Sequence, residues 1–168
     1  MANDIVTQVK DTNQQLFSLL DTFDEKKLNK VPYTDSWTAA QVANHLVKSD
    51  RFLLQLLMGP TRETTRKTDA QVQQLADTFL NFDTRLKSPG MIIPDDRTFT
   101  KQEVLSDLKT ARTNLLEAAD ELDLALTTTI ESPLRESTLL ELLHFHLFHT
   151  KRHLHQLEKI KQAVSAIA

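Results

Sequence analysis

The stretch TLLELLHFHLFHTKRHLHQ, residues 138–156, carries the clearest structural signal in this sequence. Thr138 and Glu141 have the spacing of a capping box, in which each side chain bonds the backbone N–H of the other residue at a helix start. Apolar residues then recur at helical spacing. We therefore predict a helix from Thr138 to about Ser165, roughly 40 Å long at ~1.5 Å per residue, which is the length scale of a helical bundle.

Three further long helices are predicted upstream, each with an apolar stripe at helical spacing. Their bounds are about Asn3–Lys27 for the first, Thr38 to Gly59-Pro60 for the second and Thr100 to about Leu122 for the third. The second and third start at capping boxes, Thr38 with Gln41 and Thr100 with Glu103. The stripes are Ile5, Val9, Leu16, Leu20 and Phe23; Val42, Leu46, Leu53 and Leu56 or Leu57; and Val104, Leu108, Ala111, Leu115 and Ala118.

A shorter helix is predicted over about Asp69–Leu86, between the second and third long helices. Residues 61–67, 91–97 and 123–136 are expected to be connectors. The chain has 168 residues and only two glycines, which favours helices over sheets, because tight sheet turns need glycine. We predict an all-α protein, a four-helix bundle with one additional short helix, in a single domain spanning residues 1–168.

Composition excludes several classes of function. The chain has no cysteine, so disulfides and thiolate metal sites are excluded and any metal must be held by nitrogen or oxygen atoms. No apolar run has the length of a membrane span or signal peptide, which makes a cytoplasmic protein without a membrane partner the expectation. With a net charge of −3 and no basic stripe with interleaved aromatics, a nucleic-acid partner is not expected either.

Two surface features allow more than one interpretation. One is the set of Lys151, Arg152, Lys159 and Lys161, which is compatible with a surface that binds an anion or nucleic acid but is better explained as solvated helix surface near a helix carboxyl end. The apolar run 91–93 lies between two prolines in a connector, where it either covers the bundle or joins a homodimer contact.

Five of the six histidines lie in the opening stretch. Residues three, four and seven apart share a helix face, so His146, His149, His153 and Gln156 form one stripe, from which His144 and His155 fall away. The i, i+4 spacing of His149 and His153 lets two imidazoles reach one metal ion. The sixth histidine, His45, borders the inward stripe of the second helix, and inward ligands on facing helices are how bundles build metal sites.

Other interpretations of these histidines remain open. An i, i+4 histidine pair also arises on ordinary core or surface positions, in which case the bundle is purely structural. His146 is an alternative metal ligand or a group that orients one, and Glu141 either only caps its helix or orients an imidazole. A metalloprotease is disfavoured, because Thr150 stands where the glutamate base would follow the first histidine.

Three sequence features together resemble the DinB/YfiT-like superfamily of bacterial helical bundles. They are Ser36-Trp37-Thr38 leading to His45-Leu46, the helix start at Thr138, and His149-x-x-x-His153-x-x-Gln156. The resemblance implies that His45, His149 and His153 hold one divalent metal ion, with zinc or nickel the first expectations. His146 and Gln156 are then an additional ligand or groups that orient the ligands.

The resemblance implies several activities. Relatives of this kind include thiol transferases, thiol-dependent isomerases and proposed hydrolases. We therefore expect a metal-dependent enzyme of the thiol-transferase or hydrolase type that acts on a small molecule, with a low-molecular-weight thiol as the candidate second substrate. The alternative is a non-catalytic bundle that binds a metal or small ligand. No residue is assigned a catalytic role from the sequence.

Overall fold

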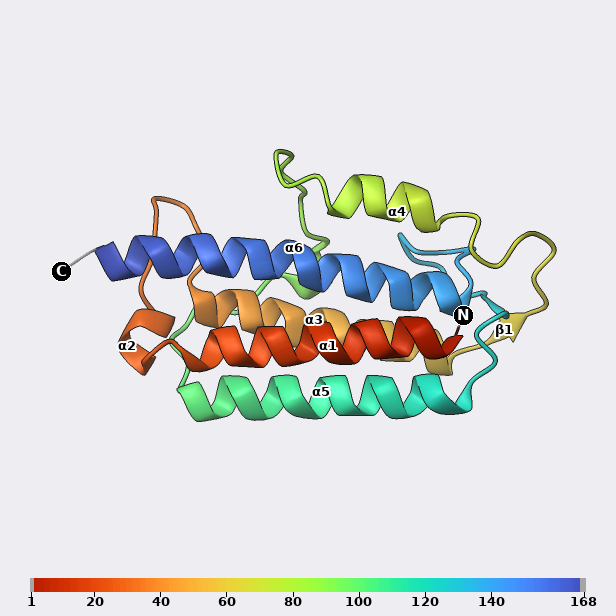
Figure 1. The fold of residues 1–168 in the computed structure, drawn as a ribbon, viewed down its shortest axis with the longest axis horizontal. Coiled ribbons are helices and arrows are strands. Elements are labelled where there is room, and N and C mark those ends of the chain that lie inside the picture. Colours follow the sequence, from red (N-terminus) through yellow and green to blue (C-terminus); the bar gives the residue numbers. More distant parts are fainter. Residues whose placement is uncertain (1, 167–168) are drawn as a thin grey trace.

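The computed structural model describes residues 2–166, most of which are helical, as predicted. Its elements in chain order are α1 (Ala2–Asp21), α2 (Glu25–Leu28), α3 (Ala39–Met58), β1 (Thr61–Arg62), α4 (Val72–Phe79), the 3-10 helix η1 (Gly90–Ile92), α5 (Lys101–Glu121), β2 (Thr127–Thr128) and α6 (Leu139–Ala166). The long helices α1, α3, α5 and α6 lie side by side (Figure 1). Within this group α1 contacts α6 and α5, and α3 contacts α5 and α6.

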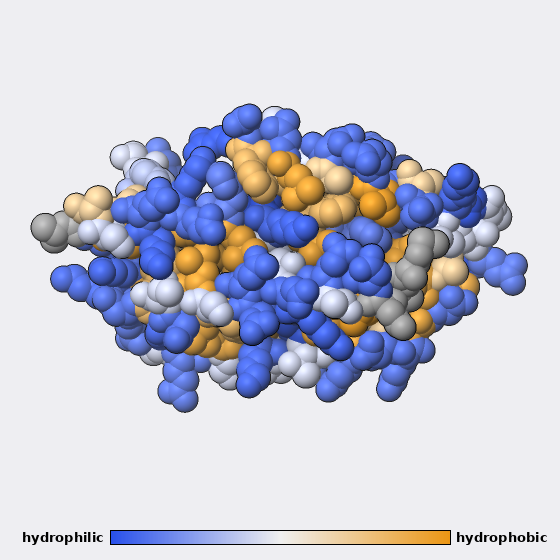
Figure 2. Space-filling view, in the orientation of Figure 1, coloured by the Kyte–Doolittle hydropathy of each residue, from blue (hydrophilic) through white to orange (hydrophobic). Residues whose placement is uncertain are grey.

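The direction of the helices explains why one connector is long. In Figure 1, α1 and α6 run one way while α3 and α5 run the other way. Since α3 and α5 are parallel neighbours, the chain must return along the whole molecule between them, and residues 59–100 make this return. That segment carries α4 and η1, which pack on α6 and α3 respectively. Figure 2 shows hydrophobic residues gathered along the seam between α4 and α6.

The predicted helix starts are confirmed, with one difference in capping. Thr38 and Gln41 bond each other's backbone N–H in a complete capping box. Thr138 and Glu141 do the same at distances of 3.1 and 2.9 Å. The Thr100 hydroxyl caps α5 by accepting the N–H of Glu103, and the Glu103 carboxylate pairs with the Arg97 guanidinium at 2.5 Å. At this third position the hydroxyl cap by Thr100 is confirmed.

Two predicted helices are shorter than expected, each because side chains compete for the backbone. The first ends at Asp21 rather than Lys27, since the Asp24 carboxylate accepts the N–H of Lys27 and caps the separate helix α2. The short helix covers Val72–Phe79 rather than Asp69–Leu86. Beyond it, the carbonyls of Asn81 and Thr84 accept hydrogen bonds from a guanidinium, described below, rather than from a continuing helix.

The prediction of plain connectors missed a small sheet. Thr61 and Arg62 of β1 pair antiparallel with Thr128 and Thr127 of β2. Both strands carry β-branched threonine, which favours extended backbone, but two-residue strands leave no periodic signal in a sequence. The ladder closes one end of the molecule next to the start of α6.

A polar layer divides the interior into two apolar clusters. One cluster gathers the carboxyl-terminal half of α1 with the amino-terminal halves of α3 and α5 and the carboxyl-terminal part of α6. The other gathers the opposite halves of the same helices. Between them, every long helix contributes buried polar residues: Thr12 and Asn13; His45, Ser49 and Asp50; Arg112; and His146, His149, Thr150 and His153. Among residues 2–166 no helix is long and apolar enough to cross a membrane.

Candidate metal centre

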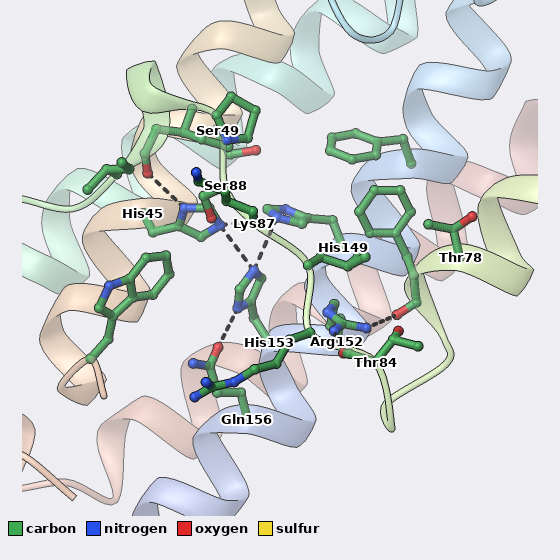
Figure 3. A pocket seen from close by; sticks show the side chains of 18 of the residues that line it. His45, Ser49, Thr78, Thr84, Lys87, Ser88, His149, Arg152, His153 and Gln156 are labelled. Carbon is green, nitrogen blue, oxygen red and sulfur yellow. Dashed lines mark hydrogen bonds between the residues drawn. The ribbon is translucent and has the colours of Figure 1, made fainter. Parts of the chain in front are cut away.

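Three histidines meet in the polar layer, at the interface of α3 and α6 (Figure 3). The Nε2 atom of His45 lies 3.1 Å from Nε2 of His149 and 3.0 Å from Nε2 of His153, and the latter two atoms are 3.1 Å apart. All three side chains are buried, with 1%, 6% and 7% of their surface exposed. We call His45, His149 and His153 the histidine triad.

Neighbouring groups orient two rings of the triad. The Nδ1 of His45 lies 2.8 Å from the Ile92 carbonyl of η1, and a carbonyl can only accept, so this nitrogen carries the proton. The Nδ1 of His153 lies 2.7 Å from Oε1 of Gln156, one turn further along α6. Both rings therefore turn an unprotonated Nε2 toward the centre of the triad. This is the arrangement by which outer hydrogen bonds fix the tautomer of a metal-binding histidine.

Aromatic packing positions the third ring. The His149 imidazole stacks on Phe145 at a centroid distance of 5.1 Å and meets the edge of Phe79 of α4. On the other side of the triad, Trp37 lies 5.0 Å from the His45 ring. Trp37 also packs against the apolar cluster that contains the amino-terminal half of α3.

The three Nε2 contacts cannot all be hydrogen bonds. A hydrogen bond joins one protonated and one unprotonated nitrogen, and each Nε2 atom is one or the other. In a triangle at least two atoms must be of the same kind, so at least one contact is repulsive whichever tautomers are chosen. A cation bound by all three lone pairs removes this conflict.

Burial keeps the triad in the form that binds metals. Desolvation lowers the pKa of His45, and it lowers the pKa of His149 well below the ordinary value of 6.5, with the other histidines adding to that effect. Burial lowers the pKa of His153 to about 3. The neutral imidazole is the metal ligand, so the site is prepared for a metal at neutral pH.

The geometry fits one divalent ion. Two imidazole nitrogens that both lie ~2.0–2.1 Å from an ion are at most about 4.2 Å apart, and the Nε2 pairs fall within that limit. Within residues 2–166 this is the one group of three or more histidine and acidic side chains close enough to hold a metal. Three protein ligands leave coordination positions open to a water or substrate.

A cavity of about 920 Å³ opens onto the triad. Its inner wall contains the three histidines with Phe52 and Phe145, and its outer wall is formed largely by residues 78–93 of the return segment. The apolar run 91–93 covers the bundle through Ile92, which is buried. Its neighbours Met91 and Ile93 are 60% and 48% exposed. A cavity of this size and lining is typical of a small-molecule site.

His146, predicted as a further ligand or orienting group, lies apart from the triad. Its Nδ1 is 3.1 Å from Oδ1 of Asp50, and Oδ2 of Asp50 is 3.0 Å from Nε of Arg112. The Arg112 guanidinium also donates to Asn13 and, at 3.0 Å, to the Thr150 hydroxyl. We call these five residues the buried network. Burial lowers the pKa of His146, and the charge of Arg112 lowers it further.

Sequence reasoning missed Asp50 and Arg112, although a signal was present. Each lies at helical spacing from stripe residues, Asp50 four after Leu46 and Arg112 four after Leu108. A charged residue within an apolar stripe indicates a buried, paired charge, because an unpaired one is costly. The sequence could have revealed that these residues are buried, but not that they pair with each other.

Arg152 was interpreted as solvated surface, and that was wrong. Its guanidinium donates to the carbonyls of Phe79, Asn81 and Thr84, the first two at 3.3 and 2.8 Å. One turn further, His155 stacks on Phe82 at 4.4 Å. The outer face of α6 thereby holds the segment that follows α4, which forms the outer wall of the cavity (Figure 3).

Glu141 and His144 serve local structure. Glu141 caps α6, binds Arg66 through both carboxylate oxygens at 2.7 Å and accepts the N–H of Gln71. Burial alone would raise the pKa of Glu141, but the hydrogen bonds from Arg66 and from the backbone N–H groups lower it below its usual value. The Nδ1 of His144 bonds the Leu140 carbonyl of its own helix, away from the triad.

Comparison with known proteins gives one match. A family model described as the DinB superfamily matches residues 8–157, which is most of the chain. The matched range contains the whole triad. No curated protein and no solved structure matches this sequence.

Proposed function

This chain belongs to the DinB superfamily, and on that premise we propose that it is a metal-dependent enzyme of the thiol-transferase or hydrolase type. In this proposal the four long helices form the four-helix bundle of one domain, and His45, His149 and His153 hold one divalent ion, zinc or nickel first. The observation that carries the proposal is the triangle of Nε2 atoms, whose contacts cannot all be hydrogen bonds.

The chain's own residues prepare the site for chemistry. The Ile92 carbonyl and Gln156 hold two imidazoles with their lone pairs inward, and Phe145 fixes the third ring. A bound divalent ion would supply the Lewis acidity that lowers the pKa of a water or thiol at its open positions. The cavity brings a small molecule to that point and shields it from bulk water.

The lining of the cavity favours a thiol as the nucleophile. Among the described residues that line it, the only carboxylate is the exposed Asp35, so the inner wall offers no carboxylate base. Before either binds a metal, a free thiol already has a much lower pKa than water, about 8.5 against ~15.7, so its deprotonation depends less on a base from the protein. Thiol transfer is therefore the first reaction to test and ester hydrolysis the second.

Elemental analysis tests the metal directly. We expect one divalent ion per chain in purified protein or after reconstitution with zinc or nickel. A variant with His45, His149 and His153 all changed to Ala should bind none, and His144→Ala, which removes a histidine outside the triad, should keep the ion. Absence of stoichiometric metal from both native and reconstituted wild-type protein would overturn the proposal.

Turnover assays then separate an enzyme from a binding protein. Reconstituted protein is offered an aromatic electrophile with a low-molecular-weight thiol, and separately an activated ester. Turnover that disappears on chelation and returns with metal supports catalysis. Tight metal binding with no turnover of either substrate favours the non-catalytic alternative. That alternative would be strengthened by a fourth protein ligand, a position that His146 does not take up, because it binds Asp50.

A further inference from the structure

The cavity is strongly asymmetric in charge. Four cationic side chains line it, Arg85, Lys87, Arg152 and Lys159, against the single carboxylate of Asp35. The chain as a whole carries a net charge of −3, so this positive excess is local. An ordinary solvated surface of this chain would be slightly acidic. The wall that faces a small molecule is basic instead.

The four cations are not equivalent. Arg152 is committed to three backbone carbonyls and holds the outer wall in place. For Arg85, Lys87 and Lys159, no ion pair or hydrogen bond of the charged group is found within residues 2–166. These three side chains are exposed at the mouth of the cavity, and we call them the basic mouth.

The two ends of the cavity are lined by different kinds of side chain. The triad is at most 7% exposed and therefore lies at its inner end, whereas the basic mouth is open to solvent. The rest of the lining is mostly apolar and aromatic, and it includes Trp37, Phe79 and Leu86. A molecule that fills this space would contact histidine nitrogens at its inner end, hydrophobic side chains along its body and positive charge at its outer end.

We propose that the site selects an amphipathic anion, with an apolar body in the aromatic part of the cavity and a carboxylate, sulfonate or phosphate group at the basic mouth. The inference rests on the proposed function, since it takes the triad as the reactive end. Low-dielectric walls that carry one sign of charge raise the local concentration of the opposite charge and guide its approach. Arg85 and Lys87 are then specificity-determining residues.

A matched pair of ligands tests the inference. 1-Octanesulfonate and 1-octanol share an apolar body and differ in the charge of the head group. Binding is measured by isothermal titration calorimetry on protein as purified and again after chelation, so that a bound ion cannot be the source of any preference. We expect the sulfonate to bind more tightly than the alcohol in both samples, and added salt to reduce the difference.

Variants locate the preference. Arg85→Gln with Lys87→Gln should weaken sulfonate binding roughly three- to tenfold, which is the effect of losing two exposed charge interactions, and leave octanol binding unchanged. The control changes the same net charge on exposed residues of α1 and α5, Lys10→Gln with Lys109→Gln, and should leave both ligands unaffected. Arg85→Lys with Lys87→Arg keeps the charges and should keep the preference.

Several results would overturn the inference. They are equal binding of the two ligands, an equal loss for both in the Arg85/Lys87 variant, or an equal loss of sulfonate binding in the control pair. Elemental analysis of the same samples keeps the two proposals separate. Missing metal with an intact head-group preference contradicts the proposed function alone, whereas bound metal with no preference contradicts only this inference.

Discussion

The histidine triad and the buried network lie in the same layer of the molecule, between the two apolar clusters, yet they differ in whether opposite charges face one another. In the network, the carboxylate of Asp50 faces the guanidinium of Arg112 and the N–H of His146. In the triad, three like atoms face each other at 3.0–3.1 Å. Paired opposite charges indicate a structural role, whereas like nitrogen atoms in contact indicate a site that a ligand from outside completes.

The network also connects more of the fold than the triad does. It takes Asn13 from α1, Asp50 from α3, Arg112 from α5, and His146 and Thr150 from α6. Every long helix therefore contributes to it, whereas the triad joins only α3 and α6. The network fixes the positions of the four helices relative to one another. The triad depends on that alignment, because its histidines come from α3 and α6. The two should respond differently to substitution.

The largest expected effect is the loss in the free energy of unfolding when a charge of the buried network is removed. Asp50→Asn leaves the buried Arg112 charge without its counter-ion, and we expect a loss of about 3–5 kcal/mol in the free energy of unfolding. Urea denaturation at neutral pH measures it. The double variant Asp50→Leu with Arg112→Met should recover most of this loss, because it removes both charges together. If Asp50→Asn cost less than about 1 kcal/mol, the ion pair would not hold the helices as argued.

The triad should stabilise the protein only when metal is present. At a free zinc concentration of 100 times the Kd, we expect wild-type protein to gain about 2.7 kcal/mol in the free energy of unfolding. His149→Ala should gain little, since it removes one of three ligands. Asp50→Asn, measured under conditions where it is folded, should keep the full gain. Equal zinc stabilisation of wild type and His149→Ala would show that zinc binds elsewhere.

Local signals made much of the fold predictable. The helix starts at Thr38 and Thr138 follow from pairs of residues three apart, and the apolar stripes follow from spacing alone. The predictions were wrong where a distant or competing contact decides the outcome. The end of α1 depends on the Asp24 cap, and the length of α4 on Arg152, which lies some 70 residues further along the chain.

The candidate site was predictable only in part, for a similar reason. The facing of His149 and His153 follows from helix geometry within α6. Their meeting with His45, 104 residues earlier, depends on how α3 packs against α6, and the family resemblance supplied that link. His146 shares the same helix face, yet it lies about one turn before His149 along α6 and binds Asp50 rather than joining the triad. Spacing alone does not resolve that difference.

The smallest expected effect is the pH dependence of the free energy of unfolding that His146, the single histidine of the network, contributes. Burial lowers the pKa of His146, so the folded protein keeps this residue neutral where the unfolded chain, with a pKa near 6.5, takes up a proton. Its stabilising contribution is present above pH 6.5 and is lost as the pH falls below that value. Protonation would place an N–H on the buried Nε2, which has no partner within residues 2–166.

His146→Asn tests this without removing the bond to Asp50, because the asparagine amide can donate from nearly the same place as Nδ1. Stability of metal-free wild type and variant is compared by urea denaturation between pH 7 and 5, above the range in which most carboxylates titrate. Below pH 6.5 the wild-type curve should fall more steeply, by up to about 1.4 kcal/mol per pH unit, the value for one proton. Parallel curves would mean that His146 takes up its proton equally in both states, and that Asp50, rather than burial and Arg112, sets its charge.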